Sequence, residues 1–257
     1  MRVALVQFDV RWESPAENYL RTERHIQEAA ACGARLVLLP EMFATGFSMR
    51  PERIAETTDG ATHAFLSAVA ADLGIHIIAG VATTVPGVER PENRAVHVSP
   101  AGIQESYAKI HPFSFAGEEQ HYGAGTRVAT WHIEGLRVTP FICYDLRFPE
   151  PFRLAADDTD LYVVIANWPE RRRYHWQTLL RARAIENLAY VAGVNRVGEG
   201  EGLHYAGDSA LISPWGEALV SAAEGESVLL ADVSPGVVAQ ARANFPALHD
   251  RRAGYAR

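Results

Sequence analysis

Hydrophobic residues along the chain fall into two alternating patterns. Short all-apolar runs such as Leu36–Leu39 are typical of strands that are buried on both faces. Longer segments such as Ala16–Ala31 place Leu20, Ile26 and Ala30 among charged residues at helical spacing. We therefore expect helices at Ala16–Ala31, Ala61–Leu73, Tyr174–Leu188 and Val237–Ala243. We expect strands at Val3–Phe8, Leu36–Leu39, Ile75–Val81, Ala95–Val98, Ile103–Lys109, Arg127–Ile133, Leu136–Ile142, Leu161–Ala166, Tyr190–Asn195, Asp208–Ser213, Glu217–Ser221 and Ser227–Val233.

The order of these elements indicates an α/β protein. Strand–helix–strand units occur near both ends of the chain, and the middle holds short strands separated by turn signals. The last three strands are interpreted as a closing meander. No Pro-, Gly- or Ser-rich linker interrupts the chain, so we expect one domain over residues 1–257. Two mixed sheets packed together, with helices outside, would cover the apolar runs on both faces.

Composition and charge change this picture little. The chain is 48% hydrophobic and 21% charged, with a formal net charge of −7, which argues against a nucleic-acid groove. No apolar run approaches the ~20 residues of a membrane span, and the start MRVALVQFDVRW does not resemble a signal peptide. Two cysteines cannot form a disulfide framework. We therefore expect a cytoplasmic protein with no membrane or nucleic-acid partner, and we expect Cys32 to be a packing residue.

A reactive side chain lies at the end of three of the predicted strands. Glu41 follows a Leu-Leu-Pro run, Lys109 follows a Tyr-Ala pair, and Cys143 follows a Phe-Ile pair. Ligand sites gather at strand ends in α/β folds, because the loops leave the sheet there. Taken singly, the three residues are typical of a solvated carboxylate, a surface lysine and a packed thiol. Taken together, they are complementary in acyl transfer through a thioester.

The chemistry of that reaction explains why these three residue types belong together. A thiol needs a base, but a carboxylate near pKa 4 is about 4 units too acidic for a thiol near 8.5, or roughly 6 kcal/mol. Burial of the carboxylate and a nearby cation can close that gap. Lys109 would supply the cation. It would also hold the oxyanion of a tetrahedral intermediate, together with the backbone N–H of Tyr144 just after the sharp turn at Cys143.

Three blocks, LLPEMFATGF, YAKIHPF and ICYDLRFPE, resemble the signature blocks of the nitrilase superfamily, the carbon–nitrogen hydrolases, in order and separation. Residues 166–169 (ANWP) and 175–196 also resemble that family, so the likeness covers nearly the whole chain. The resemblance implies a triad of Glu41, Lys109 and Cys143 and a four-layer αββα sandwich. It also implies a homodimer or larger homo-oligomer, and neither a metal nor an organic cofactor.

A second glutamate in the loop after the lysine is usual in this family, seven residues before a glycine. Here the loop reads AGEEQHYGAG, and counting back from Gly125 gives Glu118, with Glu119 as its neighbour. The family resemblance implies that this carboxylate orients Lys109 or the attacking water. A solvated acidic loop tip is the alternative interpretation.

Within the superfamily, KIHPFSF, CYDLRFP, NWP and HYAGDS resemble the ω-amidase branch. That resemblance implies hydrolysis of the terminal amide of a 2-oxo-dicarboxylic acid monoamide such as 2-oxoglutaramate. The far carboxylate of such a substrate calls for a fixed cation, for which Arg172 matches the branch pattern and Arg147 is the alternative. Either arginine could instead be structural. The predicted aromatic pocket walls are Phe43, Tyr122 and Trp168.

Other interpretations stay open at this point. The same triad supports nitrile, N-carbamoyl or acyl-transfer chemistry, and the fold could also serve a non-catalytic interaction protein. A Cys–His hydrolase is a third alternative. The histidines lack the i, i+4 spacing or C-x-x-C partner of a zinc site, so we expect no metal.

Overall fold

The computed structural model describes residues 1–252, so residues 253–257 of the predicted domain 1–257 lie outside the described part. Its main elements, in chain order, are β1 (Arg2–Gln7), α1 (Pro15–Ala31), β2 (Leu36–Leu38), α2 (Pro51–Ile54), α3 (Ala61–Leu73), β3 (His76–Thr83), β4 (Glu92–Ser99), β5 (Gly102–Ala108), α4 (Glu118–His121), β6 (Trp131–Ile133), β7 (Leu136–Ile142), α5 (Pro149–Leu154), β8 (Leu161–Ala166), α6 (Arg173–Asn187), β9 (Tyr190–Asn195), β10 (Val197–Gly200), β11 (Leu203–Ala206), β12 (Ala210–Ile212), β13 (Ala218–Ser221), β14 (Ser227–Asp232) and α7 (Pro235–Asn244).

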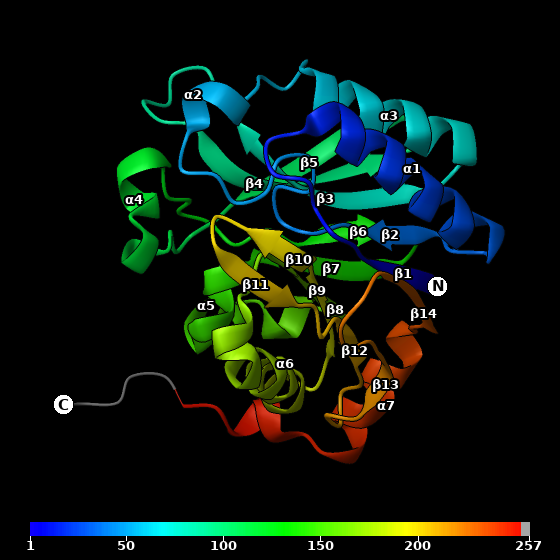
Figure 1. Cartoon of the computed structure of the whole chain (residues 1–257). Coiled ribbons are helices and arrows are strands. Elements are labelled where there is room, and N and C mark those ends of the chain that lie inside the picture. The colour runs from blue at the N-terminus through cyan, green and yellow to red at the C-terminus, as the bar shows by residue number, and fades with distance from the viewer. Residues whose placement is uncertain (253–257) are drawn as a thin grey trace.

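The elements form four layers. Two six-stranded sheets, ordered β14-β1-β2-β3-β4-β5 and β13-β12-β9-β8-β7-β6, pack against each other. Helices α1 and α3 cover the outer face of the first sheet, and α5 and α6 lie on the outer side of the second (Figure 1). The predicted α/β class and the αββα sandwich are therefore confirmed.

Alternating side chains of the strands explain why both faces of each sheet are apolar. In β1, Val3 and Leu5 belong to the core between the sheets, whereas Ala4 and Val6 belong to the core beneath α1 and α3. Successive side chains of a strand point to opposite faces, so a run of apolar residues contacts both layers at once. The all-apolar run Leu36–Leu39 follows the same rule.

The two sheets repeat one pattern of strand directions. Strands β1, β2 and β3 are parallel in the first sheet, as are β7, β8 and β9 in the second, and antiparallel strands flank both sets. The middle strands of the two sets, β2 and β8, are followed by Glu41 and Asn167. The backbone N–H of Asn167 donates to Glu41 Oε2 at 2.8 Å. The packing of the two sheets therefore brings these two strand ends together.

The sequence predicted the central elements well. Helix α3 and strands β7, β8 and β9 have the predicted bounds. The predicted strand Arg127–Ile133 was too long, because only β6 (Trp131–Ile133) pairs with β7. Just before this segment, the Gly125 N–H donates to the carbonyl of Lys109, the residue after β5, at 2.7 Å. The short hairpin β10–β11 was not predicted.

The prediction of a closing meander was wrong. Strands β12 and β13 form a hairpin in the second sheet, but β14 crosses to the first sheet and pairs antiparallel with β1. The crossing covers the otherwise open edge of β1, which would expose unpaired backbone groups. An exposed ion pair between Arg2 and Asp232 (3.0 Å) lies at one end of this strand pairing.

The environment of Cys32 also differs from the prediction. Cys32 is exposed just after α1, because the apolar stripe of that helix lies on the side of Ile26 and Ala29. Over residues 1–252, no helix has both the length and the apolar character needed to cross a membrane.

Gly80 of β3 allows the chain after β2 to approach closely. A methyl group built at Gly80 would lie 2.5 Å from Glu41 Cα and 2.5 Å from Met42 N, which are backbone atoms that cannot swing aside. We expect Gly80→Ala to lower the free energy of unfolding by about 1–3 kcal/mol, measured by urea denaturation. Gly236→Ala is the matched control, since its methyl would meet only Ser234 Oγ at 3.5 Å. Equal stability of the two variants would contradict this account of Gly80.

Candidate active site

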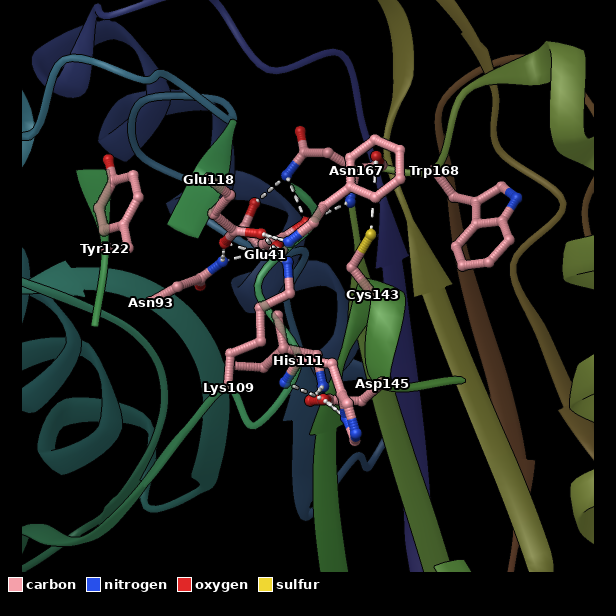
Figure 2. Close-up of polar contacts among 12 residues, drawn as sticks. Glu41, Asn93, Lys109, His111, Glu118, Tyr122, Cys143, Asp145, Asn167 and Trp168 are labelled. Carbon is pink, nitrogen blue, oxygen red and sulfur yellow. Dashed lines mark hydrogen bonds and ion pairs between the residues drawn. The ribbon is translucent and has the colours of Figure 1, made fainter. Parts of the chain in front are cut away.

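Glu41, Lys109 and Cys143 converge from three strand ends. Lys109 directly follows β5 and Cys143 directly follows β7, while Glu41 lies in the turn after β2. Figure 2 shows the three side chains pointing toward one another. Lys109 Nζ donates to Glu41 Oε1 at 3.0 Å, and both side chains are fully buried. The structure therefore brings together the three residues that the sequence predicted.

A second carboxylate completes the surroundings of Lys109. Glu118 Oε2 accepts from Lys109 Nζ at 2.8 Å, and Glu118 is fully buried, whereas Glu119 is exposed. The amide of Asn93 donates to Glu41 Oε1 at 2.7 Å and to Glu118 Oε1 at 2.9 Å (Figure 2). Glu118 is thus the glutamate of this loop that lies in the site.

The charges of the cluster depend on one another. Burial alone lowers the pKa of Lys109, but the carboxylates of Glu118 and Glu41 outweigh it and raise that pKa above its ordinary value. Burial raises the pKa of Glu118, and the Lys109 charge offsets only part of this rise. The ammonium form of Lys109 is therefore strongly favoured.

Cys143 adopts a strained backbone conformation. Its φ of 45° lies in the left-handed region, which is uncommon for a side-chain-bearing residue and is often found where a function requires it. The chain turns from β7 directly into a one-turn 3₁₀ helix, Cys143–Arg147. This sharp turn directs the sulfur toward the strand ends, and Sγ lies 3.9 Å from the carbonyl oxygen of Asn167.

The thiol of Cys143 is stabilised in its neutral form. Burial raises the pKa of Cys143 well above its ordinary value, and the Glu41 carboxylate adds to the rise. The Lys109 ammonium lowers it without cancelling the rise. Lys109 was expected to stabilise a thiolate, and its charge does lower the pKa of Cys143, but two buried carboxylates and the loss of hydration outweigh one ammonium.

Asn167 and Asn93 lie in the site but were not predicted as site residues. Asn167 Nδ2 donates to the Glu41 carbonyl at 2.6 Å, and its backbone N–H binds the Glu41 carboxylate. Asn167 lies in the ANWP block, so that block was the available signal. Asn93 stands inside β4, and its strand pattern gives no such signal.

A cavity of about 70 Å³ reaches Cys143. Its lining combines apolar and aromatic residues with two arginines: Phe47, Phe113, Ala116, Cys143, Tyr144, Asn167, Trp168, Pro169, Arg171, Arg172, Leu203 and Tyr205. A wider outer cavity of about 480 Å³ shares Phe47, Ala116, Leu203 and Tyr205 with it. The predicted residues Tyr144, Trp168 and Arg172 are therefore on the wall of this cavity.

Two predicted wall residues, Phe43 and Tyr122, lie elsewhere. Phe43 packs with Tyr19 and Phe65 beneath the helices of the first sheet, and Phe47 takes the wall position. Tyr122 is buried beside Met42, and its hydroxyl donates to the Ser48 carbonyl at 2.7 Å.

The two candidate arginines differ in position. The Arg172 guanidinium lies 5.0 Å from the ring centre of Phe113 on the cavity wall, and burial and the charge of Arg171 lower the pKa of Arg172. Arg147 is not among the lining residues and instead donates to His175 Nδ1 at 3.2 Å. Among residues 1–252, no group of three or more His, Cys, Asp or Glu side chains is placed to hold a metal ion.

Comparison with known proteins agrees with the geometry. Residues 2–243 match the pattern of the family described as carbon-nitrogen hydrolase. The chain belongs to the carbon-nitrogen hydrolase family. It is thereby a hydrolase of carbon–nitrogen bonds, and the resemblance to the nitrilase superfamily is confirmed.

Several relatives are similar over nearly the whole chain. Omega-amidase YafV of Escherichia coli K12 is 37% identical over 252 residues, which cover 97% of this chain and 96% of the relative. The 2-oxoglutaramate amidase of Bacillus subtilis strain 168 is 29% identical over 252 residues, 97% of each chain.

Solved structures share the fold. XC1258 from Xanthomonas campestris, a CN-hydrolase superfamily protein with an arsenic adduct in its active site, is 40% identical with a TM-score of 0.93, covering 100% of this chain and 98% of that one. A double mutant of the amidase from Nesterenkonia sp. AN1 in complex with acrylamide is 25% identical with a TM-score of 0.86, covering 98% and 94%.

The state of the Cys143 thiol can be measured by alkylation. Because its pKa is raised, the thiolate forms only as pH rises above the ordinary thiol range, so the rate with iodoacetamide should climb without a plateau between about pH 6 and pH 9. Peptide mass spectrometry would follow Cys143, with the exposed Cys32 as internal comparison and Cys143→Ala as control. A plateau at or below neutral pH would contradict the neutral resting thiol.

Proposed function

We propose that this protein is a cysteine amidohydrolase that cleaves the terminal amide of a small 2-oxo-dicarboxylic acid monoamide, such as 2-oxoglutaramate, to the dicarboxylate and ammonia. The observation that carries the proposal is a buried Glu41–Lys109–Glu118 cluster that meets Cys143 at the end of an arginine-walled cavity. Relatives named omega-amidase and 2-oxoglutaramate amidase support this substrate class.

The first half of the reaction forms a thioester. Glu41 accepts the thiol proton while Cys143 Sγ forms a bond to the amide carbonyl carbon, so a free thiolate need not accumulate. The developing oxyanion is stabilised by the Lys109 ammonium and the Tyr144 N–H. Glu41 then gives its proton to the leaving nitrogen, the C–N bond breaks, and ammonia departs.

The second half restores the enzyme. Glu41 takes a proton from water, whose oxygen attacks the thioester carbon at the same oxyanion position. The C–S bond breaks and the sulfur recovers the proton from Glu41, which releases the carboxylic acid product. Glu118 keeps Lys109 charged and oriented in both halves, because both of its oxygens accept from the ammonium, at 3.1 and 2.8 Å.

The charged groups near the cavity differ in position. Glu41 and Glu118 are not among the lining residues, whereas Arg172 stands on the wall, where a guanidinium can pair with a carboxylate of the substrate. The small volume next to Cys143 favours short acyl chains. Trp168 Nε1 donates to the Arg172 carbonyl at 2.8 Å and so helps to fix the arginine segment.

The other interpretations receive less support. Among the described residues, the hydrogen-bond partner of Cys143 Sγ is the Asn167 carbonyl and not a histidine, and His111, a candidate base for a Cys–His hydrolase, does not line the cavity. No feature of the cavity favours nitriles or N-carbamoyl compounds over amides. A non-catalytic role would not explain why an ammonium and two carboxylates are buried together, since burying charged groups costs free energy.

An ammonia-release screen tests the reaction. We expect kcat/KM for 2-oxoglutaramate to exceed that for aliphatic nitriles and N-carbamoyl compounds by about 100-fold or more, since buried polar groups reject substrates that leave them unpaired. Rapid-quench mass spectrometry should show an acyl adduct on Cys143 during turnover. Cys143→Ala should abolish both signals, and Cys32→Ser should leave them unchanged. Faster turnover of nitriles, or no adduct with any amide, would refute the proposal.

The role of Arg172 is tested separately. Arg172→Gln should lower kcat/KM for 2-oxoglutaramate by about 10- to 100-fold, mostly through KM, because a charge-assisted contact worth ~1.5–3 kcal/mol is lost. A neutral short amide should be affected by less than about twofold. Arg147→Gln is the matched control and should change neither substrate. The reverse pattern would assign the substrate carboxylate to Arg147.

A further inference from the structure

The carboxylate of Asp145 lies fully buried just below the reacting residues (Figure 2). Its Oδ1 accepts from the backbone N–H of His111 at 2.9 Å and from His111 Nδ1 at 2.9 Å. Its Oδ2 accepts from the Tyr107 hydroxyl at 2.8 Å and from the Ile142 N–H at 3.1 Å. Both oxygens are therefore satisfied, although no Lys or Arg side chain pairs with Asp145 within residues 1–252.

The donors come from the segments that carry the ammonium and the thiol. Tyr107 and His111 lie two residues before and after Lys109, and Ile142 immediately precedes Cys143. Tyr107 lies near the end of β5 in the first sheet and His111 just after it, while Ile142 is the last residue of β7 in the second sheet. One carboxylate therefore joins, across the two sheets, the strand ends on which Lys109 and Cys143 stand.

The geometry at Cys143 needs such a support. A left-handed φ at a residue with a side chain costs about 1–3 kcal/mol and persists only where the surroundings hold it. The bond from Ile142 N–H to Asp145 fixes the entry to this turn. The stacking of His111 on Phe148, with ring centres 3.8 Å apart, fixes the exit on the same side.

We propose that Asp145 is a positioning residue that sets the distance between the Cys143 sulfur and the Glu41–Lys109 pair, with His111 as its main link to the lysine segment. The proposal rests on the amidase reaction proposed above. Asp145 does not line the cavity, so it acts through the residues that it binds. A misplacement of about 1 Å in a reacting group can cost about 100-fold in rate, which is the kind of loss that this link prevents.

A pair of substitutions at His111 isolates the hydrogen bond. His111→Ala removes the donor and the ring, whereas His111→Asn removes the ring but keeps an N–H donor near the position of Nδ1. We expect kcat to fall about 10- to 100-fold in His111→Ala, with KM within about twofold of wild type, and to recover to within about threefold in His111→Asn. Both variants would be measured well below their unfolding temperatures, which thermal denaturation would supply.

Alkylation of Cys143 by iodoacetamide provides a readout that needs no substrate. In a Cys32→Ser background, the rate should fall in His111→Ala and recover in His111→Asn, in parallel with kcat. Asp145→Asn is the second variant, since an NH₂ group in place of one oxygen must face a donor, and it should lose kcat at least as strongly as His111→Ala. If it does not fold, the His111 pair still decides.

The outcomes separate this proposal from the proposed function. Equal kcat and equal alkylation rates for His111→Ala and His111→Asn would overturn the positioning role, as would a loss confined to KM, while wild-type turnover would leave the amidase reaction standing. Absence of amide turnover in the wild type, with the alkylation pattern as expected, would refute the amidase reaction and keep the positioning role.

Discussion

The ammonium of Lys109 lies out of water between two buried carboxylates, and the rest of the site depends on this ion cluster. A buried charge without partners would cost several kcal/mol, so the lysine, Glu41 and Glu118 stabilise one another only as a set. Removing one member of such a set costs about 3–5 kcal/mol, because it leaves an uncompensated charge. The amide groups of Asn93 and Asn167 occupy further lone pairs of the carboxylates. This arrangement fixes the orientation of Glu41 before any substrate arrives.

The fold supplies the cluster through its repeated arrangement of parallel strands. Strands β2 and β8 are the middle strands of the two parallel sets, and their carboxyl ends lie close together. Glu41 and Asn167, which follow these ends, therefore meet across the interface between the sheets. Lys109 and Cys143 arrive on neighbouring strand ends, and Asp145 ties these two ends together. The sandwich therefore holds in place the four short segments that carry Glu41, Lys109, Cys143 and Asn167.

Features that depend on neighbouring residues in the sequence could be predicted from the pattern of apolar and polar residues. The apolar run Leu136–Ile142 has the bounds of β7, and the strand-end positions of Lys109 and Cys143 could be recognised from their neighbours. Asn93 could not, since its role exists only where β4 passes between two distant carboxylates. Phe43 and Phe47 are equally aromatic in sequence, and only the turn after β2 decides that Phe47 faces the cavity. The pairing of β14 with β1 is likewise a long-range choice, driven by an open sheet edge.

The charges of the site also explain why a neutral resting thiol suits the proposed reaction. Glu41 and Glu118 together outweigh Lys109, so a thiolate at Cys143 would add a further negative charge to a buried, already anionic cluster. Transfer of the thiol proton to Glu41 avoids this, because the proton reduces the charge of the cluster as sulfur forms its bond to carbon. The same net charge repels an anionic substrate group from the reacting end, while Arg171 and Arg172 attract it at the cavity wall. For a monoamide of a dicarboxylic acid, repulsion from the buried carboxylates and attraction to the wall arginines both favour the orientation that places the amide, rather than the carboxylate, next to Cys143.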